Sequence, residues 1–182
     1  SVASFFLSRI DVLVDPLLDK IISQNGNQTD LAKKLQGQVA TASAVTAYQI
    51  YNEIFHGKNF KHLADHGAGV QRLLWASTST KNPNYSDLMY VDPLIGPDTI
   101  NTIPIKTLDA YRDHGKPRVR LEQDIAGANS TLKRLPDLGI NLDQVTQQLE
   151  NEGVEKFNRS FDKLMSALKQ KSRQPREIHA VA

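Results

Sequence analysis

The segment from Gln71 to Pro83 limits the folds open to this chain more than any other. Its apolar and β-favouring residues between Leu73 and Thr78 lack helical spacing, and they give way abruptly to hydroxyl, cationic and amide side chains. This pattern predicts a buried strand that opens into a polar loop. In a parallel sheet or barrel, ligands bind at the carboxyl end of such a strand. The side chains suited to hold a phosphate or polyol there are Ser77, Ser79, Thr80, Lys81 and Asn82.

The residues before this segment predict another strand followed by helices. Val2 to Leu7 alternates like a strand, and Ser8 to Asp11 is expected to form an arginine-bearing loop after it. Asp15 and Pro16 suit the N-cap and first position of a helix. From Asp30 to about His56 a long amphipathic helix is expected. Its apolar face comprises Ala44, Ala47, Tyr48, Tyr51, Ile54 and Phe55.

The order of strand, helical crossover and strand predicts parallel pairing, because antiparallel neighbours would not need so long a connection. A second unit follows. Asn84 to Ile95 is expected to be helical, Thr99 to Pro104 to be a short strand, and Ile105 to His114 to be a helix with Gly115 as its left-handed cap. Two consecutive units favour an α/β barrel or open sheet over a helical bundle.

After Arg118 no further strand is expected. Asn141 suits the N-cap of a helix, and the residues from Pro175 onward are expected to form a loose tail. The later apolar residues recur at spacings of three and four, which predicts a stripe that packs on a scaffold, with membrane or partner binding as the alternative. This stripe comprises Val154, Phe157, Phe161, Leu164 and Leu168.

Composition excludes several classes of function. A net charge of +2 argues against a strongly basic nucleic-acid binder. The absence of cysteine removes disulfides, thiolate zinc sites and a thiol nucleophile, and it suits a reducing cytoplasm. No apolar run has the length that crosses a bilayer, so no membrane partner is expected. The chain opens at Ser1 as though cut at the start of a buried strand, so we expect a fragment.

The first strand also ends in candidate ligand groups. Ser4, Phe6 and Arg9 would present a hydroxyl, an apolar wall and a guanidinium to one cavity. Arginine suits phosphate because its planar fork makes two charge-assisted hydrogen bonds. Taken singly, Arg9 is better explained as an ordinary surface arginine, and Lys81 is explained equally well as a solvated loop lysine. Two cations behind neighbouring strands favour convergence on a phosphosugar.

The histidines and lysines give no sign of a metal site or of a covalent lysine nucleophile. His56, His66 and His114 each precede a glycine at a helix end, where interaction with the helix carbonyls explains them better than catalysis does. No histidine pair with a carboxylate shows metal-ligand spacing, so no metal is expected. A covalent lysine would need a buried position on a barrel strand. None of the predicted strands carries a lysine.

The amino-acid sequence closely resembles the second half of a transaldolase, of the bacterial branch that is also found fused to glucose-6-phosphate isomerase. The resemblance spans nearly the whole chain, with weaker agreement from Gly153 to Phe157. The segments that carry it are Ala3 to Asp11, Arg72 to Pro83, Tyr85 to Asp87, Leu94 to Thr99, and Asp113 to Gly115.

The resemblance implies a TIM (β/α)8 barrel of which this chain supplies the last three strands and the terminal helices. Residues 1–117 would form units six to eight, and residues 118–182 the terminal helices and tail of the same barrel domain. It also implies transfer of a dihydroxyacetone unit between sedoheptulose 7-phosphate and glyceraldehyde 3-phosphate, in the pentose phosphate pathway, with no cofactor. The Schiff-base lysine and the acid and base carboxylates of the family lie on earlier strands, outside this chain.

The resemblance assigns roles to the candidate residues. Ser4 would touch the substrate, Phe6 would line the pocket, and Arg9 and Ser77 would bind phosphate. The family's basic residue in the next loop appears here only at Lys81, beside Ser79 and Asn82. Trp75 stands where many members have glycine. Strand parity would turn Trp75 to the same side as Ser77, and a bulge near Ala76 is expected to resolve the crowding.

Other interpretations stay open. Another phosphosugar aldolase or isomerase could use the same barrel, and a non-catalytic helical module could use the stripe between Val154 and Leu168 for interaction with a partner. A half-barrel would leave two sheet edges open, so the expected partners are sugar phosphates and the amino-terminal half of the same barrel, or a second copy through self-association. The isolated chain is expected to be inactive.

Overall fold

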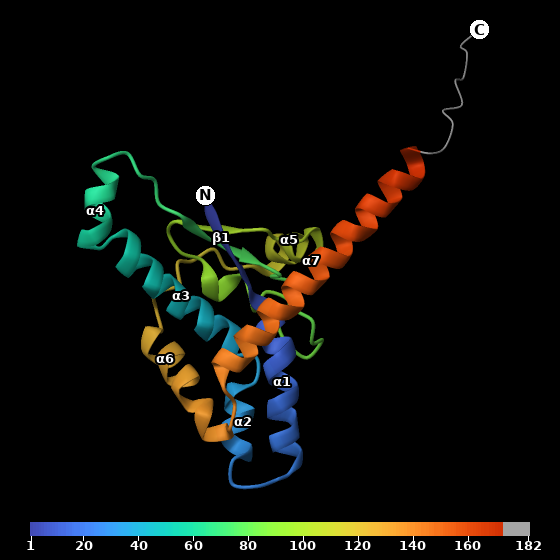
Figure 1. The fold of residues 1–182 in the computed structure, drawn as a ribbon. Coiled ribbons are helices and arrows are strands. Elements are labelled where there is room, and N and C mark those ends of the chain that lie inside the picture. Colours follow the sequence, from blue (N-terminus) through green and yellow to red (C-terminus); the bar gives the residue numbers. More distant parts are fainter. Residues whose placement is uncertain (173–182) are drawn as a thin grey trace. The chain divides into compact units, whose positions relative to one another are not determined.

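The computed structural model describes residues 1–172, which divide into two compact units. The first unit is Ser1–Val145, and the second begins at Thr146. The first unit is an α/β structure built on a three-stranded parallel sheet (Figure 1). Its helices are α1 (Leu7–Ser23), α2 (Thr29–Leu35), α3 (Val39–Phe55), α4 (Lys58–Ala64), η1 (Asp92–Leu94), α5 (Ile105–His114), α6 (Ile125–Arg134) and η2 (Pro136–Leu138).

The sheet confirms the predicted parallel pairing. The strands β1 (Val2–Phe6), β2 (Arg72–Ala76) and β3 (Thr99–Asn101) lie in that order, and both pairs are parallel. The connection from β1 to β2 runs through four helices, as the crossover argument requires. Two of the strands are shorter than expected, because β2 stops before Ser77, whose φ is 53°, and β3 stops at Asn101.

The two faces of the sheet differ in burial. Phe5 pairs in register with Trp75, and Trp75 pairs with Asn101, so these three side chains share one face. Trp75 is 1% exposed, and its Nε1 donates to the carbonyl oxygen of Leu94 in η1 at 3.1 Å. Ser4 shares the opposite face with Leu74 and is exposed. The helical layer therefore covers the Trp75 face.

The expected bulge near Ala76 is absent. Ala76 stays in register with Phe6, and Trp75 is accommodated on the helical face against Phe5, at a ring-centroid distance of 6.0 Å. The chain changes direction one residue later, at Ser77, through its left-handed conformation.

Two helix predictions near the start of the chain are wrong. Residues Ser8 to Asp11 form the first turns of α1 rather than a loop, and Asp15 and Pro16 lie inside α1 rather than at its start. The Asp15 carboxylate does not cap its own helix, because it accepts hydrogen bonds from Gly37 N at 3.0 Å and Tyr85 Oη at 2.9 Å. Residue types that suit a local cap serve a tertiary contact here.

The long helix predicted from Asp30 is interrupted. It divides into α2 and α3 around Gly37, whose φ of 64° is left-handed. A Cβ on Gly37 would lie 3.0 Å from the Tyr85 ring, so this position needs glycine for its conformation and for the close approach of Tyr85. The predicted end of the helix at His56 is confirmed.

The segment from Asn84 to Ile95 is also not the predicted helix. It forms turns and the single 3-10 turn η1, with Leu88, Tyr90 and Val91 buried. Its tyrosine hydroxyls reach α1 instead of lying on a helix surface. The expected left-handed cap at Gly115 is wrong as well, since its φ is −64°.

The second unit contains most of α7 (Leu142–Ser172). The predicted cap is confirmed, because Asn141 Oδ1 accepts from Gln144 N at 3.2 Å. The apolar stripe from Val154 to Leu168 is more than half exposed at each of its five residues. The expected tail from Pro175 onward lies outside the described residues. Within the described residues, no helix has both the length and the apolar character of a membrane span.

Candidate active site

The carboxyl ends of β1 and β2 meet through their backbones. Ser8 N, at the start of α1, donates to the carbonyl oxygen of Ser77 at 3.2 Å. Parallel pairing of the two strands thus places the residues that follow β1 beside those that follow β2. The candidate ligand residues predicted from the sequence follow these two strand ends.

Arg9 and Phe6, two members of the first predicted cluster, are in contact. The Arg9 Cζ lies 4.6 Å from the centroid of the Phe6 ring, within the range of a cation–π interaction. Arg9 projects from the first turn of α1, not from a loop. Ser4 lies two residues earlier on β1, on the same strand face as Phe6. An aromatic ring under the guanidinium orients it without using its hydrogen-bond donors.

The second cluster is tied together by internal hydrogen bonds. Lys81 Nζ donates to Ser79 Oγ at 2.6 Å, and Asn82 Oδ1 accepts from Asn84 N at 3.0 Å. Thr80 Oγ1 donates to the carbonyl oxygen of Ser86 at 2.7 Å. Ser77 is half-buried. The bonds give the loop a defined course directly after β2.

Lys81 and Asn82 also line a hollow of about 250 Å³ that sequence reasoning did not anticipate. Its other walls are Asp11, Val12, Asp15, Pro16, Asp19, Tyr85 and Tyr90. Arg9 does not line this hollow. Three carboxyl side chains disfavour an anion at this place, so the hollow is not where Arg9 and Lys81 would jointly hold a phosphate.

Two aspartates of α1 fasten the loop after β2 to the helical layer. Asp11 accepts from Ala40 N at 2.9 Å and from Tyr90 Oη at 2.8 Å. Asp15, one turn later, accepts from Gly37 N and Tyr85 Oη. We call these four contacts the aspartate–tyrosine clamp. Asp11 and Asp15 stand four residues apart, and this spacing is the sequence signal that could have revealed them as one face of α1.

Burial sets the ionisation of the clamp. It raises the pKa of Asp11 to about 6, although the hydrogen bonds from Ala40 N and Tyr90 act in the opposite direction. The pKa of Asp15 is raised by the same cause. The pKa values of Tyr85 and Tyr90 lie well above the ordinary tyrosine value, first because the hydroxyls are buried and then because they bond to carboxylates. The tyrosines are therefore the donors in the clamp.

Comparison with known proteins identifies the family. The sequence profile described as transaldolase/fructose-6-phosphate aldolase matches residues 1–168. The chain belongs to the transaldolase/fructose-6-phosphate aldolase family.

Curated transaldolases agree with this membership. The transaldolase of Trichodesmium erythraeum is 49% identical over 175 residues, covering 94% of this chain and 46% of that protein. Transaldolase 2 of a Nostoc species is 47% identical over 176 residues, covering 94% and 46%. The transaldolase of Thiobacillus denitrificans is 48% identical over 168 residues, covering 92% and 45%. The chain therefore spans about half the length of the curated relatives that it matches.

The family fold accounts for the sheet. A TIM barrel closes eight parallel strands, each followed by helical structure, with its site at their carboxyl ends. The described part of this family member contains three parallel strands, with Phe6 and Arg9 at the carboxyl end of β1 and Ser77 at that of β2. None of these three strands contains a lysine. The strand residues described here hence offer no Schiff-base nucleophile.

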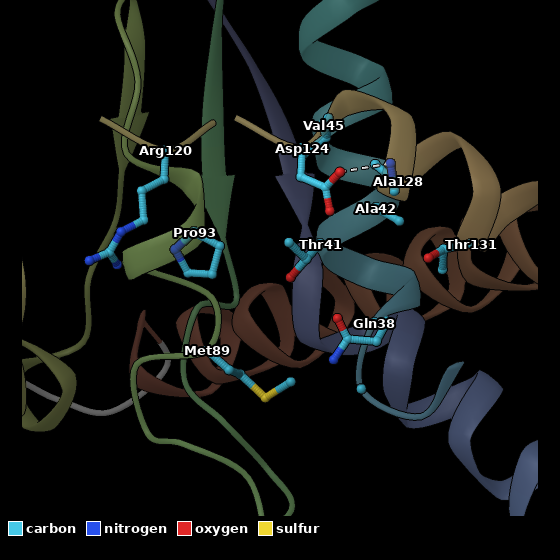
Figure 2. Close-up of a pocket in the computed structure, with 12 residues that line it drawn as sticks. Gln38, Thr41, Ala42, Val45, Met89, Pro93, Arg120, Asp124, Ala128 and Thr131 are labelled. Atoms are coloured by element: carbon cyan, nitrogen blue, oxygen red, sulfur yellow. Dashed lines mark hydrogen bonds between the residues drawn. The ribbon is translucent and has the colours of Figure 1, made fainter. Parts of the chain in front are cut away.

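A separate cavity of this family member lies in the helical layer. It has a volume of about 380 Å³ and is lined from α3, α6 and the segment around η1 (Figure 2). Its charged groups already have protein partners. Asp124 Oδ1 accepts from Gly127 N at 2.8 Å, and Arg120 pairs with Asp92 at 3.2 Å. The cavity is lined by none of the sequence-predicted site residues.

His114 links the end of α5 to the loop after β2 through Asp87. Its Nε2 lies 3.0 Å from Asp87 Oδ1, and its Nδ1 lies 3.1 Å from Asp113 Oδ2. The hydrogen bond to Asp87 and then that to Asp113 raise the pKa of His114. Sequence reasoning treated this histidine as a helix-end residue and missed its bridge to Asp87.

The His114 bridge yields a testable pH dependence. Replacing Asp87 by Asn is expected to move the pKa of His114 back toward the ordinary histidine value, because one of two carboxylate acceptors is lost. The stabilisation from this bridge is present while His114 is protonated and is lost as pH rises through its raised pKa. Titration of the His114 ring signals by NMR measures the shift. An unchanged pKa in the Asp87→Asn variant would contradict the bridge, and Asp109→Asn is the control.

Proposed function

We propose that this chain is the strand-six-to-end part of a transaldolase barrel and supplies the phosphate-binding side of its active site. The reaction would move a dihydroxyacetone unit between sedoheptulose 7-phosphate and glyceraldehyde 3-phosphate through a Schiff base, without a cofactor. The observation that carries the proposal is Arg9, held over Phe6 at the carboxyl end of β1 and beside the end of β2, in a member of this family.

Arg9 has the chemistry that the phosphate of such a substrate needs. Its guanidinium offers several donors in one plane, and the Phe6 ring contacts it without accepting a hydrogen bond. Ser4 and Ser77 would add hydroxyls from the two adjacent strand ends. Ser79, Lys81 and Asn82 would act from the following loop. Their contribution would be smaller, because Lys81 Nζ is already bonded to Ser79 Oγ and shares its hollow with three aspartates.

The covalent step would need a lysine from outside residues 1–182. The strands β1, β2 and β3 supply none, and the outer edges of β1 and β3 have no strand partner among the described residues. Unpaired edges favour the addition of further strands. We therefore propose the amino-terminal half of the same barrel as the structural partner, with self-association of this chain as the competing outcome.

Borohydride trapping tests where the Schiff base forms. With fructose 6-phosphate, the chain alone is expected to give no reduced adduct, whereas the barrel completed by the amino-terminal half is expected to give one on a lysine of that half. Mass spectrometry locates the adduct. A stable adduct on residues 1–182 would contradict the proposed division of the site. Formation of the dihydroxyacetone adduct releases one equivalent of glyceraldehyde 3-phosphate. Release beyond that equivalent only when erythrose 4-phosphate is added would distinguish transfer from simple aldol cleavage.

Removal of Arg9 gives the sharpest test of phosphate binding. Arg9→Ala is expected to weaken binding of fructose 6-phosphate by about 10- to 100-fold, the effect of losing a charge-assisted, bidentate contact. Lys81→Ala is expected to have a smaller effect. Titration followed by NMR measures both. Arg72→Ala is the matched control, because Arg72 opens β2 at the opposite end of the strand. Equal losses for Arg9→Ala and Arg72→Ala would refute the assignment.

A further inference from the structure

Two histidines lie four residues apart at the end of α4. His62 is in the last turn of the helix, and His66 follows in the same helical course, since His66 N donates to the carbonyl oxygen of Leu63 at 3.0 Å. Their ring centroids are 4.7 Å apart, at an interplanar angle of 66°. Both side chains are exposed. The rings therefore approach each other in a place that solvent and ions can reach.

The hydrogen bond of His66 fixes its tautomer. Its Nδ1 lies 2.8 Å from the carbonyl oxygen of His62. A carbonyl oxygen only accepts, so Nδ1 must carry the hydrogen, and in the neutral ring Nε2 then keeps its lone pair. Histidines that bind metals commonly donate their other ring N–H in this way to a carbonyl or carboxylate. His66 is thus prepared to bind a cation through Nε2.

The spacing of the two rings suits one shared ion. Imidazole nitrogens bind Zn²⁺ at about 2.0–2.1 Å in tetrahedral geometry, which puts two ligating rings roughly 5 Å apart between centroids. The observed separation is close to this value. The rings meet edge to face and are not stacked in parallel.

We propose that His62 and His66 form a binding site for a divalent transition metal of the class that prefers imidazole, namely Zn²⁺, Ni²⁺ or Cu²⁺. Two protein ligands leave the remaining positions to water, because the described residues contain no group of three or more histidine or acidic side chains that could hold a metal. Among these ions, Cu²⁺ should bind most tightly. The proposal does not depend on the proposed transaldolase function, and it revises the expectation of no metal.

Titration of the full chain with Cu²⁺ at neutral pH tests the site. We expect one equivalent to bind, with nitrogen hyperfine splitting from two imidazoles in the electron paramagnetic resonance spectrum. His62→Gln and His66→Gln are each expected to weaken binding by about 10-fold or more, as loss of a ligand requires. Both side chains are exposed, so the variants should keep the circular dichroism of the parent chain.

Three control variants make the test specific. His56→Gln and His114→Gln remove exposed imidazoles outside the pair, and His179→Gln removes the one that lies beyond the described residues. Each should leave the first equivalent of Cu²⁺ unchanged. The proposal is overturned if no binding is detected, if the spectrum shows a single imidazole, or if a control variant abolishes binding while His62→Gln and His66→Gln do not.

Discussion

Replacing Trp75 by alanine is expected to lower the free energy of unfolding by about 4 kcal/mol, the usual cost of deleting a fully buried aromatic side chain. Trp75 is 1% exposed in the middle of the sheet and meets Phe5 edge to face. The deletion would leave a cavity between β2 and the helical layer. It would also leave the carbonyl oxygen of Leu94 without its side-chain donor.

Trp75→Phe separates these contributions. Phenylalanine keeps most of the apolar contact and loses the bond from Nε1 to Leu94, so we expect a smaller cost, with about 1 kcal/mol from the lost hydrogen bond. Urea unfolding followed by circular dichroism measures both variants. If Trp75→Ala unfolds at the same urea concentration as the parent chain, the role of Trp75 in holding η1 on the sheet is wrong.

Replacing Asp11 by alanine is expected to destabilise the chain by about 3 kcal/mol, because Ala40 N–H and the Tyr90 hydroxyl would both lose a buried acceptor. Asp11→Asn should cost far less. Its amide oxygen can still accept from Ala40 N, its amide group can donate to Tyr90, and no buried charge remains. The pair of variants therefore distinguishes loss of the contacts from loss of the charge.

The raised pKa of Asp11 adds a pH dependence with a defined sign. Because burial raises its pKa to about 6 in the folded chain, the folded state binds more protons than the unfolded state between about pH 4 and pH 6. The free energy of unfolding should fall across this window as pH rises, by about 3 kcal/mol from this carboxyl group. In Asp11→Asn that part of the fall should disappear. Urea unfolding of both chains across the window measures the difference, and parallel profiles would contradict the assignment.

The sheet could be predicted because its signals are local. The residues from Leu73 to Thr78 lack helical spacing, and the long helical stretch before them leaves parallel pairing as the simple solution. The nearness of Arg9 and Phe6 at the end of β1 is local in the same sense, since they stand three positions apart along the chain, although their direct contact was not predicted. Local spacing was sufficient for these features.

The helical layer could not be predicted in the same way. Asp11 accepts hydrogen bonds from Ala40 and Tyr90, which lie 29 and 79 positions later in the chain. The residues next to Asp11 in the sequence give no signal of these partners. The loop after β2 was therefore predicted to be a helix, although the hydroxyls of its two tyrosines donate hydrogen bonds to the aspartates of α1. The acidic wall beside Lys81 has the same origin, because it belongs to a helix more than sixty residues earlier in the chain.

The bond between Ser8 N and the carbonyl oxygen of Ser77 has a consequence for redesign of this region. It joins the ends of β1 and β2 through main-chain atoms alone, so the hydroxyl groups of Ser8 and Ser77 take no part in it. The bond would survive loss of either hydroxyl. However, Ser8 is 2% exposed and Ser77 has a φ of 53°, so only small side chains suit Ser8, and Ser77 needs a residue that tolerates a left-handed backbone. A library at Ser77 restricted to glycine, asparagine and aspartate would therefore change the polar groups at the end of β2 and leave the link between the strand ends in place.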